Sequence, residues 1–138
     1  MRLRLFALMV AVSIPMPAFA AAPVNGNWYS DNKDSIVTIG QCGPVVCGKI
    51  SKIIAPTKDG KPARDENNPN PALRNRPVLG LELLSGFKDA GKEWVGVIYD
   101  PRAGKSYKSK LVRLVNGNLQ VKGCVGPFCK SVIFTPVK

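Results

Sequence analysis

The side chains best suited to chemistry in this sequence are carboxylates, arginines and tyrosines, because its 138 residues include no histidine. The lack of imidazole excludes Ser–His triads, Cys–His dyads and most zinc hydrolases. The polar candidates gather in two stretches, residues 65–76 and 99–102, with one tyrosine shortly after them. They are Asp65, Asn68, Arg74, Arg76, Tyr99, Asp100, Arg102 and Tyr107.

Two interpretations of this polar set remain open from the residues alone. Guanidinium groups bind carboxylates and phosphates through paired hydrogen bonds. Arg74, Arg76 or Arg102 could therefore hold the anionic head group of a ligand. The same arginines could instead pair with Asp65 and Asn68 and with free backbone groups, and so do no more than tie down their own loop.

Catalysis is a third interpretation of the same residues. Asp65, Glu66 and Asp100 could act as acid and base, together with Tyr99 or Tyr107. A carboxylate pair cleaves a glycosidic bond when its members lie about 5–10 Å apart, and nothing in the sequence sets that distance. We therefore expect a protein that is not an enzyme and that uses no metal and no cofactor.

The four cysteines form two Cys-x4-Cys clusters, and each cluster encloses a Gly-Pro pair. Cross-pairing between the clusters would stabilise the chain by about 4–5 kcal/mol in the chain-entropy model, against roughly 2 kcal/mol for local pairing. We nevertheless favour local pairing, Cys42 with Cys47 and Cys124 with Cys129, because a Gly-Pro turn brings its own two cysteines together. A four-thiolate zinc site is the remaining alternative.

The N-terminus has the pattern of a secretory signal peptide. Arg2 and Arg4 precede an apolar run at 5–14, and Ala18 and Ala20 follow as a small-residue cleavage pattern. The run is too short to span a bilayer, which takes about 20 residues; an uncleaved anchor or a buried helix is the alternative. We predict a signal peptide at 1–20 and one domain at 21–138. Losing two arginines lowers the net charge from +11 to +9.

The remaining chain alternates apolar and polar residues with period two, which predicts short strands separated by turns. The expected strands are 25–30, 35–39, 45–54, 78–87, 93–100, 105–115, 118–125 and 130–137. In the fourth strand, Leu79, Leu81 and Leu83 should share one face. In the sixth, the alternation loses phase, which a bulge near Leu111 would explain.

Short connections favour an all-β fold, an eight-stranded antiparallel up-and-down barrel, because closure removes the sheet edges. A two-sheet β-sandwich is the alternative. One connection, 55–77, is long and contains five prolines, with a short helix possible near 72–75. Loops of that length are usually functional or disordered.

Strand direction sorts the connections between the two ends of such a barrel. Residues 31–34, 55–77, 100–104 and 124–129 should share one end. The polar stretches 65–76 and 99–102 are therefore predicted neighbours, and we expect the ligand-binding residues at this mouth.

An ordered set of short motifs resembles, over nearly the whole length, the bacterial family catalogued as domain of unknown function 2147. The matching motifs are Gly26-Asn27-Trp28, Cys47-Gly48-Lys49-Ile50, Asp65, Asn68-Pro69, Leu73-Arg74, Arg76-Pro77, Gly80, Ile98-Tyr99-Asp100-Pro101, Gly104-Lys105-Ser106-Tyr107 and Leu119-Gln120-Val121-Lys122-Gly123. The family is similar to lipocalins in fold, which implies small-molecule binding and a barrel closed at one end by Trp28. It has no established activity.

The chain departs from the resemblance at its end. Family members often end Trp-Thr-Arg, with a cation that could cover the opening tryptophan, whereas this chain has Phe134-Thr135-Pro136. A cation over Trp28 would then have to come from elsewhere, for example from Lys138.

We therefore expect a periplasmic or secreted protein that binds an unknown small apolar or amphipathic molecule. The alternative is an envelope interaction protein whose positive charge attracts an anionic surface or a partner protein. Nucleic acid is not an expected partner, because the exported chain has no aromatic and basic platform. The protein is not expected to span a membrane.

Overall fold

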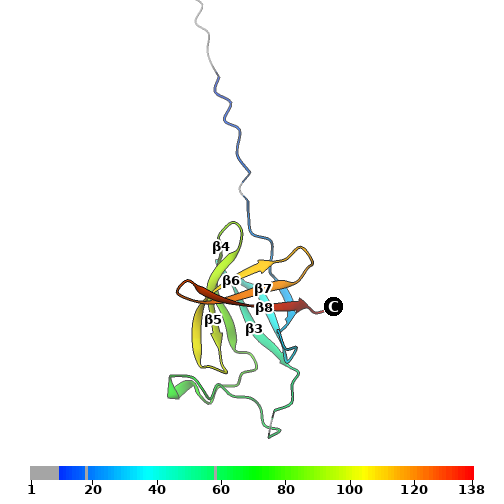
Figure 1. Ribbon diagram of the computed structural model, residues 1–138, viewed down its shortest axis with the longest axis vertical. Helices are drawn as coiled ribbons and strands as arrows, with labels where there is room; N and C mark the ends of the chain where they lie inside the picture. The colour runs from blue at the N-terminus through cyan, green and yellow to red at the C-terminus, as the bar shows by residue number, and fades with distance from the viewer. Residues whose placement is uncertain (1–9, 18, 58) are drawn as a thin grey trace, which may run out of the picture.

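The computed structural model describes residues 10–17, 19–57 and 59–138, and in these residues eight antiparallel strands form a closed barrel in chain order (Figure 1). The predicted up-and-down barrel is confirmed, and the β-sandwich is excluded. The elements are β1 (Gly26–Tyr29), β2 (Ser35–Cys42), β3 (Val45–Ile53), η1 (Pro71–Leu73), β4 (Glu82–Asp89), β5 (Trp94–Asp100), β6 (Lys105–Arg113), β7 (Leu119–Val125) and β8 (Phe128–Pro136).

Half of the predicted signal peptide, residues 1–9 and 18, lies outside the described residues, including Arg2, Arg4 and Ala18. Residues 10–17 and 19–20 are all exposed and run away from the barrel as an extended segment (Figure 1). Burial begins at Ala21 and continues at Val24. Within the described part of the chain, no helix has the length and apolar character needed to cross a membrane.

Inward-facing residues of all eight strands but β5 form one core, because successive side chains of a strand point to opposite faces. Its buried members are Val24, Trp28, Val37, Ile39, Val46, Leu84, Phe87, Leu111, Leu119, Val121 and Phe134. On β5 the inner face carries the partly buried Trp94 and Ile98, which pack against this core.

Trp28 is a buried core residue whose indole N–H donates to the carbonyl of Val24 at 3.0 Å. The guanidinium of Arg113 on β6 lies 4.7 Å from the centre of the indole ring. The cation over Trp28 therefore comes from Arg113, and not from Lys138, which the sequence offered as an example. Arg113 lies two residues after Leu111 and faces inward like it. The loss of phase in the sequence of β6 therefore reflects an inward-facing arginine that contacts Trp28.

Glycines mark the places where large side chains cross the barrel interior. A Cβ at Gly96 would lie 2.7 Å from the ring of Phe87, and one at Gly48 would lie 2.9 Å from Leu84. Neither position therefore has room for a side chain. Core side chains fill the space between the walls at these levels, as expected for a small eight-stranded barrel.

The fourth strand differs from the prediction in its start and in its buried face. It begins at Glu82, because the preceding residues form a turn in which Gly80 has a φ of +86°. Leu79 is consequently exposed, whereas Leu84 and Phe87 are buried. The predicted leucine face is wrong at Leu79, because the turn changes the phase of the alternation that follows it; Leu81 is buried and Leu83 packs partly buried against the core.

The predicted bulge near Leu111 is also wrong. Leu111 lies opposite Trp94 on one side and Val121 on the other, in uninterrupted register with both neighbouring strands. A shift between β4 and β5 occurs instead between Ser85 and Lys88, around a glycine of positive φ. Glycine tolerates the left-handed backbone that such bulges need.

The cysteines pair locally, Cys42 with Cys47 and Cys124 with Cys129, as we favoured. Each pair closes a hairpin whose turn is a Gly-Pro dipeptide, and the glycine of each turn has positive φ. Cross-pairing and a thiolate zinc site are both excluded, since all four sulfur atoms are used.

The barrel closes where β1 meets β8. Trp28 pairs with Pro136 and Tyr29 with Thr135 at this junction, whereas β5 and β6 pair along seven residues. The junction is therefore the shortest of the barrel's pairings.

Candidate functional site

The connection between β3 and β4, residues 54–81, is called the long loop below. Its two arms pair with each other, because Val78 N–H donates to Ala63 O at 2.9 Å and Asp65 N–H donates to Arg76 O at 3.0 Å. A single bridge between Arg64 and Pro77 lies between these bonds. The long loop is thus closed at its base and is not a free lid.

Asp65 is the centre of the polar residues that the long loop brings together. Its carboxylate is fully buried and accepts three side-chain hydrogen bonds. Tyr99 Oη donates to Oδ1 at 2.6 Å, while Asn68 Nδ2 and Arg76 Nε each donate to Oδ2 at 2.8 Å. Since Tyr99 belongs to β5, these bonds fix the long loop to the barrel wall.

The electrostatics of this cluster favour an Asp65 that is ionised at neutral pH. Burial alone would raise the pKa of Asp65, but the hydrogen bonds from Tyr99, Asn68 and Arg76 and the charge of Arg76 outweigh burial and hold that pKa below its usual value. Burial and the neighbouring carboxylate raise the pKa of Tyr99. Tyr99 therefore remains a neutral hydrogen-bond donor to a fixed negative charge.

Further contacts extend the cluster to Arg74 and to the turn after β5. Arg74 Nε donates to Asn68 O at 2.8 Å, and Asn67 Nδ2 donates to Arg102 O at 2.8 Å. A Cβ at Gly104 would lie 1.8 Å from the Asn67 carbonyl oxygen, so only glycine permits this close approach. The predicted neighbourhood of 65–76 and 99–102 is confirmed.

Three of the sequence candidates lie outside this cluster. Asp100 and Arg102 face each other across 3.6 Å at the β5–β6 turn, with the Arg102 side chain 74% exposed. Tyr107 lies on the inner face of β6 opposite Ile98, where it is half-buried. The structure thus joins Asp65, Asn68, Arg74, Arg76 and Tyr99 and leaves Asp100, Arg102 and Tyr107 apart.

We call the joined residues the Asp65 brace, because their hydrogen bonds are directed at one another and at the loop backbone. Arg76 also lies over the ring of Tyr99, with its guanidinium carbon 5.5 Å from the ring centre. The Asp65 carboxylate already has three side-chain donors, so it offers little capacity for a ligand. The geometry of Asp65 and Asn68 agrees with the bracing interpretation of the sequence.

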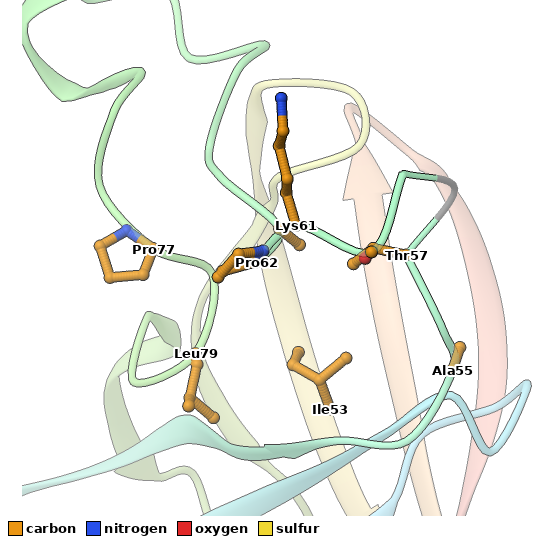
Figure 2. A pocket seen from close by; sticks show the side chains of 9 residues that line it. Ile53, Ala55, Thr57, Lys61, Pro62, Pro77 and Leu79 are labelled. Carbon is orange, nitrogen blue, oxygen red and sulfur yellow. The ribbon is translucent and has the colours of Figure 1, made fainter.

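A hollow of about 390 Å³ lies beside the brace, at the base of the long loop (Figure 2). We call it the mouth hollow. Figure 2 shows Ile53 and Leu79 on its floor and the side chain of Lys61 extending away from that floor. The other lining residues are Ala55, Thr57, Gly60, Pro62, Ala63 and Pro77. Among the described lining residues the wall is mostly apolar, and the cation at the rim is Lys61.

Sequence reasoning missed the mouth hollow. Leu79 was assigned to a strand face and Ile53 to the end of another strand, so neither was considered for a site. The available signal was the pair of apolar residues that flank a proline-rich loop on both sides. A second hollow of about 490 Å³ is lined by Tyr29, Lys33, the β6–β7 turn and the C-terminal end of β8. Neither hollow is lined by the buried core residues.

The part of the chain that the structure describes contains no group of three or more side chains suited to hold a metal ion.

Comparison with known proteins agrees with the barrel. The model of a family described as "Uncharacterized protein conserved in bacteria (DUF2147)" matches residues 26–136. The solved structure of protein HP1028 from Helicobacter pylori, described as belonging to the lipocalin family, is similar with a TM-score of 0.72 and 23% identity. The similarity covers 86% of this chain and 85% of that one. No curated protein matches the chain significantly.

Proposed function

The chain belongs to the DUF2147 family and has a lipocalin-like barrel, and from this premise we propose that it binds a small amphipathic anion in the mouth hollow. The observation that carries the proposal is an apolar hollow with a lysine at its rim, beside a braced loop. A hollow of about 390 Å³ lies near the lower end of the ordinary range for ligand pockets.

The packed interior favours the mouth over the barrel axis. Phe87 covers Gly96, and Leu84 covers Gly48, so the space that a larger barrel gives to a ligand holds core side chains here. The mouth hollow instead offers exposed apolar surface, since Leu79 is 54% exposed. An apolar tail on Ile53 and Leu79 would remove that surface from water, while the head group would lie near Lys61.

The same geometry supports a binding protein rather than an enzyme. A general acid at neutral pH needs a raised carboxyl pKa, whereas the surroundings of Asp65 lower its pKa. The carboxylate is also enclosed by its three donors. Asp65 therefore suits structural bracing better than proton transfer.

We further propose that binding takes place outside the cytoplasm. Two disulfides form in the chain, and disulfides persist in oxidising compartments. The signal-peptide pattern at 1–20 supports the same location. Periplasm and extracellular medium fit equally well.

The proposal can be tested with octanoate, and with octanol as a neutral probe of equal tail length, by following methyl NMR signals during titration. We expect the methyl signals of Ile53 and Leu79 to shift with octanoate. Lys61→Gln should weaken octanoate about threefold to tenfold and leave octanol unchanged, as expected for one screened charge pair.

Two matched controls accompany this test. Leu79→Ser removes apolar surface from the hollow and should weaken both probes about tenfold, whereas Leu73→Ser lies on η1 outside it and should not. Lys33→Gln should leave octanoate binding unchanged. The proposal fails if neither probe moves the Ile53 and Leu79 signals, or if Leu73→Ser and Leu79→Ser have equal effects.

A second candidate function, docking on an anionic lipid surface, is favoured by the tip of the β7–β8 hairpin. Phe128 is 79% exposed and Val125 is 65% exposed at this tip, just beyond the Cys124–Cys129 disulfide. Figure 1 shows the hairpin projecting from the barrel. Lys130 follows on β8, exposed like the tip. An apolar tip beside cations on a positively charged chain suits insertion at the surface of an anionic bilayer.

Vesicle co-sedimentation tests this candidate with phosphatidylglycerol and phosphatidylcholine vesicles. We expect binding to the anionic vesicles only, and a loss of about tenfold with Phe128→Ser. Val115→Ser is the matched control, because Val115 is fully exposed at the turn between β6 and β7. Equal effects of the two substitutions, or equal binding to both vesicles, would rule out docking through the tip.

A further inference from the structure

The segment that precedes β1 is attached to the barrel at its first buried residue. The backbone N of Ala21 lies 3.0 and 3.1 Å from the two carboxylate oxygens of Asp89 at the end of β4. Ala21 is buried, and Val24 further along is fully buried under Trp28. A residue of the predicted cleavage pattern thus meets a carboxylate contributed by a strand 68 positions away.

The Asp89 carboxylate is held ready for this contact. Its Oδ1 accepts the N–H of Gly91 at 2.8 Å within the β4–β5 turn. The ion pairs among the described residues give Asp89 no cationic partner. A peptide N–H has one hydrogen, which the two Asp89 oxygens share here in a bifurcated bond, whereas an ammonium has three hydrogens and a positive charge.

The boundary between the predicted leader and the folded domain coincides with the backbone nitrogen of Ala21. Phe19 and Ala20 are exposed, and of the residues that the structure describes Ala21 is the first that is buried. The carbonyl of Ala22 accepts the indole N–H of Trp94 at 2.9 Å, so Ala22 also belongs to the folded part. The chain Ala18-Phe19-Ala20-Ala21-Ala22 would fit a peptidase after Ala20 or after Ala22, and only the first cut keeps both contacts.

We propose that removal of the leader between Ala20 and Ala21 completes the fold by placing a new α-ammonium group on the Asp89 carboxylate. A leader peptidase hydrolyses the Ala20–Ala21 peptide bond with one water molecule, leaving a carboxylate on Ala20 and an ammonium on Ala21. The ammonium then lies where the amide nitrogen lay, within hydrogen-bond reach of both Asp89 oxygens. Processing thereby adds an ion pair that fastens the segment carrying Val24 to the barrel.

The first measurement is the mass of the protein after export with its own leader. We expect a chain that begins at Ala21. The second is a double-mutant cycle in urea unfolding, with chains that begin at Ala21 or at Ala20, each carrying Asp89 or Asp89→Asn. The added Ala20 moves the ammonium one residue away from the carboxylate and keeps the natural sequence.

Asp89→Asn should raise the unfolding equilibrium constant more in the chain that begins at Ala21 than in the chain that begins at Ala20. The ratio of the two increases should be about threefold to tenfold, as expected for a two-oxygen ion pair at a partly exposed site. The excess should shrink in 0.5 M salt, because exposed charge pairs are screened at about that concentration. Glu82→Gln, an exposed carboxyl at the other end of β4, should act equally in both chains. The proposal is overturned by a natural start other than Ala21, or by equal effects of Asp89→Asn in the two chains.

Discussion

Replacing Asp65 by asparagine should destabilise the barrel while preserving the shape of the side chain. The carboxylate has two donors on Oδ2, from Asn68 and Arg76, and one on Oδ1, from Tyr99. The asparagine oxygen will face the two donors, and its amide will face Tyr99, whose hydroxyl can turn to accept. The hydrogen bonds survive in reduced form, and the negative charge opposite Arg76 is lost.

The magnitude follows from these contacts. A hydrogen bond to a charged group contributes about 1.5–3 kcal/mol, and a neutral one about 1 kcal/mol. Arg76 is 36% exposed, which lowers the contribution of its charge through screening. The bonds from Tyr99 and Asn68 become neutral and the bond from Arg76 loses its anionic acceptor, which together should cost about 2–3 kcal/mol of unfolding free energy.

Urea unfolding followed by tryptophan fluorescence measures this loss. At a slope of about 1.5 kcal/mol per molar urea, the midpoint should fall by about 1.3–2 M. Asp100→Asn is the matched control. Asp100 Oδ1 accepts the backbone N–H of Arg102 at 2.9 Å, a bond that an asparagine oxygen can keep, and its ion pair with the exposed Arg102 guanidinium spans 3.6 Å, so the substitution should cost under about 0.5 kcal/mol. A shift below about 0.3 M for Asp65→Asn, or equal shifts for the two variants, would refute the account of the brace.

The remaining predictions concern acid, packing and the covered tryptophan. The pKa of Asp65 in the folded state lies below its ordinary value. The stability that Asp65 contributes is therefore complete above about pH 5 and is lost as the pH falls through the folded-state pKa. The urea midpoints of wild type and Asp65→Asn should consequently converge in acid. Gly96→Ala should cost about 1–3 kcal/mol by overpacking, measured by thermal unfolding, whereas Gly40→Ala, whose Cβ would meet nothing within 4 Å, should not. Arg113→Gln should remove about 0.5–1 kcal/mol of cation–π stabilisation and shift the fluorescence of Trp28; an unchanged spectrum and midpoint would contradict the contact.

The fold could be predicted because its determinants are local. Period-two alternation defines the strands, and Gly-Pro turns bring each cysteine pair together wherever the hairpin lies. The errors arose where a backbone angle resets the phase. The positive φ of Gly80 moves the start of β4 to Glu82 and exchanges Leu79 for Leu84 in the core. A glycine shows that such an angle is possible and does not show that it is adopted.

The site was predictable only as a neighbourhood. Strand direction is sufficient to bring Asp65 and Tyr99 to one end of the barrel, and they are in contact there. Whether the contact leaves the carboxylate free depends on distances of a few tenths of an ångström. The partner of Trp28 was equally inaccessible, because Arg113 reaches it only through the exact register of the closed sheet.

The short junction between β1 and β8 is the place where the closed sheet opens most easily. Trp28 lies opposite Pro136 there, and a proline has no N–H to give to its neighbour. We expect the β1–β8 pairing to open first in local unfolding, while the seven longer strands stay paired with one another. Opening there would expose the unpaired edge of β8 to a second chain. That chain could add a strand to this edge and form a domain-swapped dimer. The segment at 21–24, which is bound to Asp89 and packs under Trp28, opposes this opening, since it must be released before β1 can separate from β8.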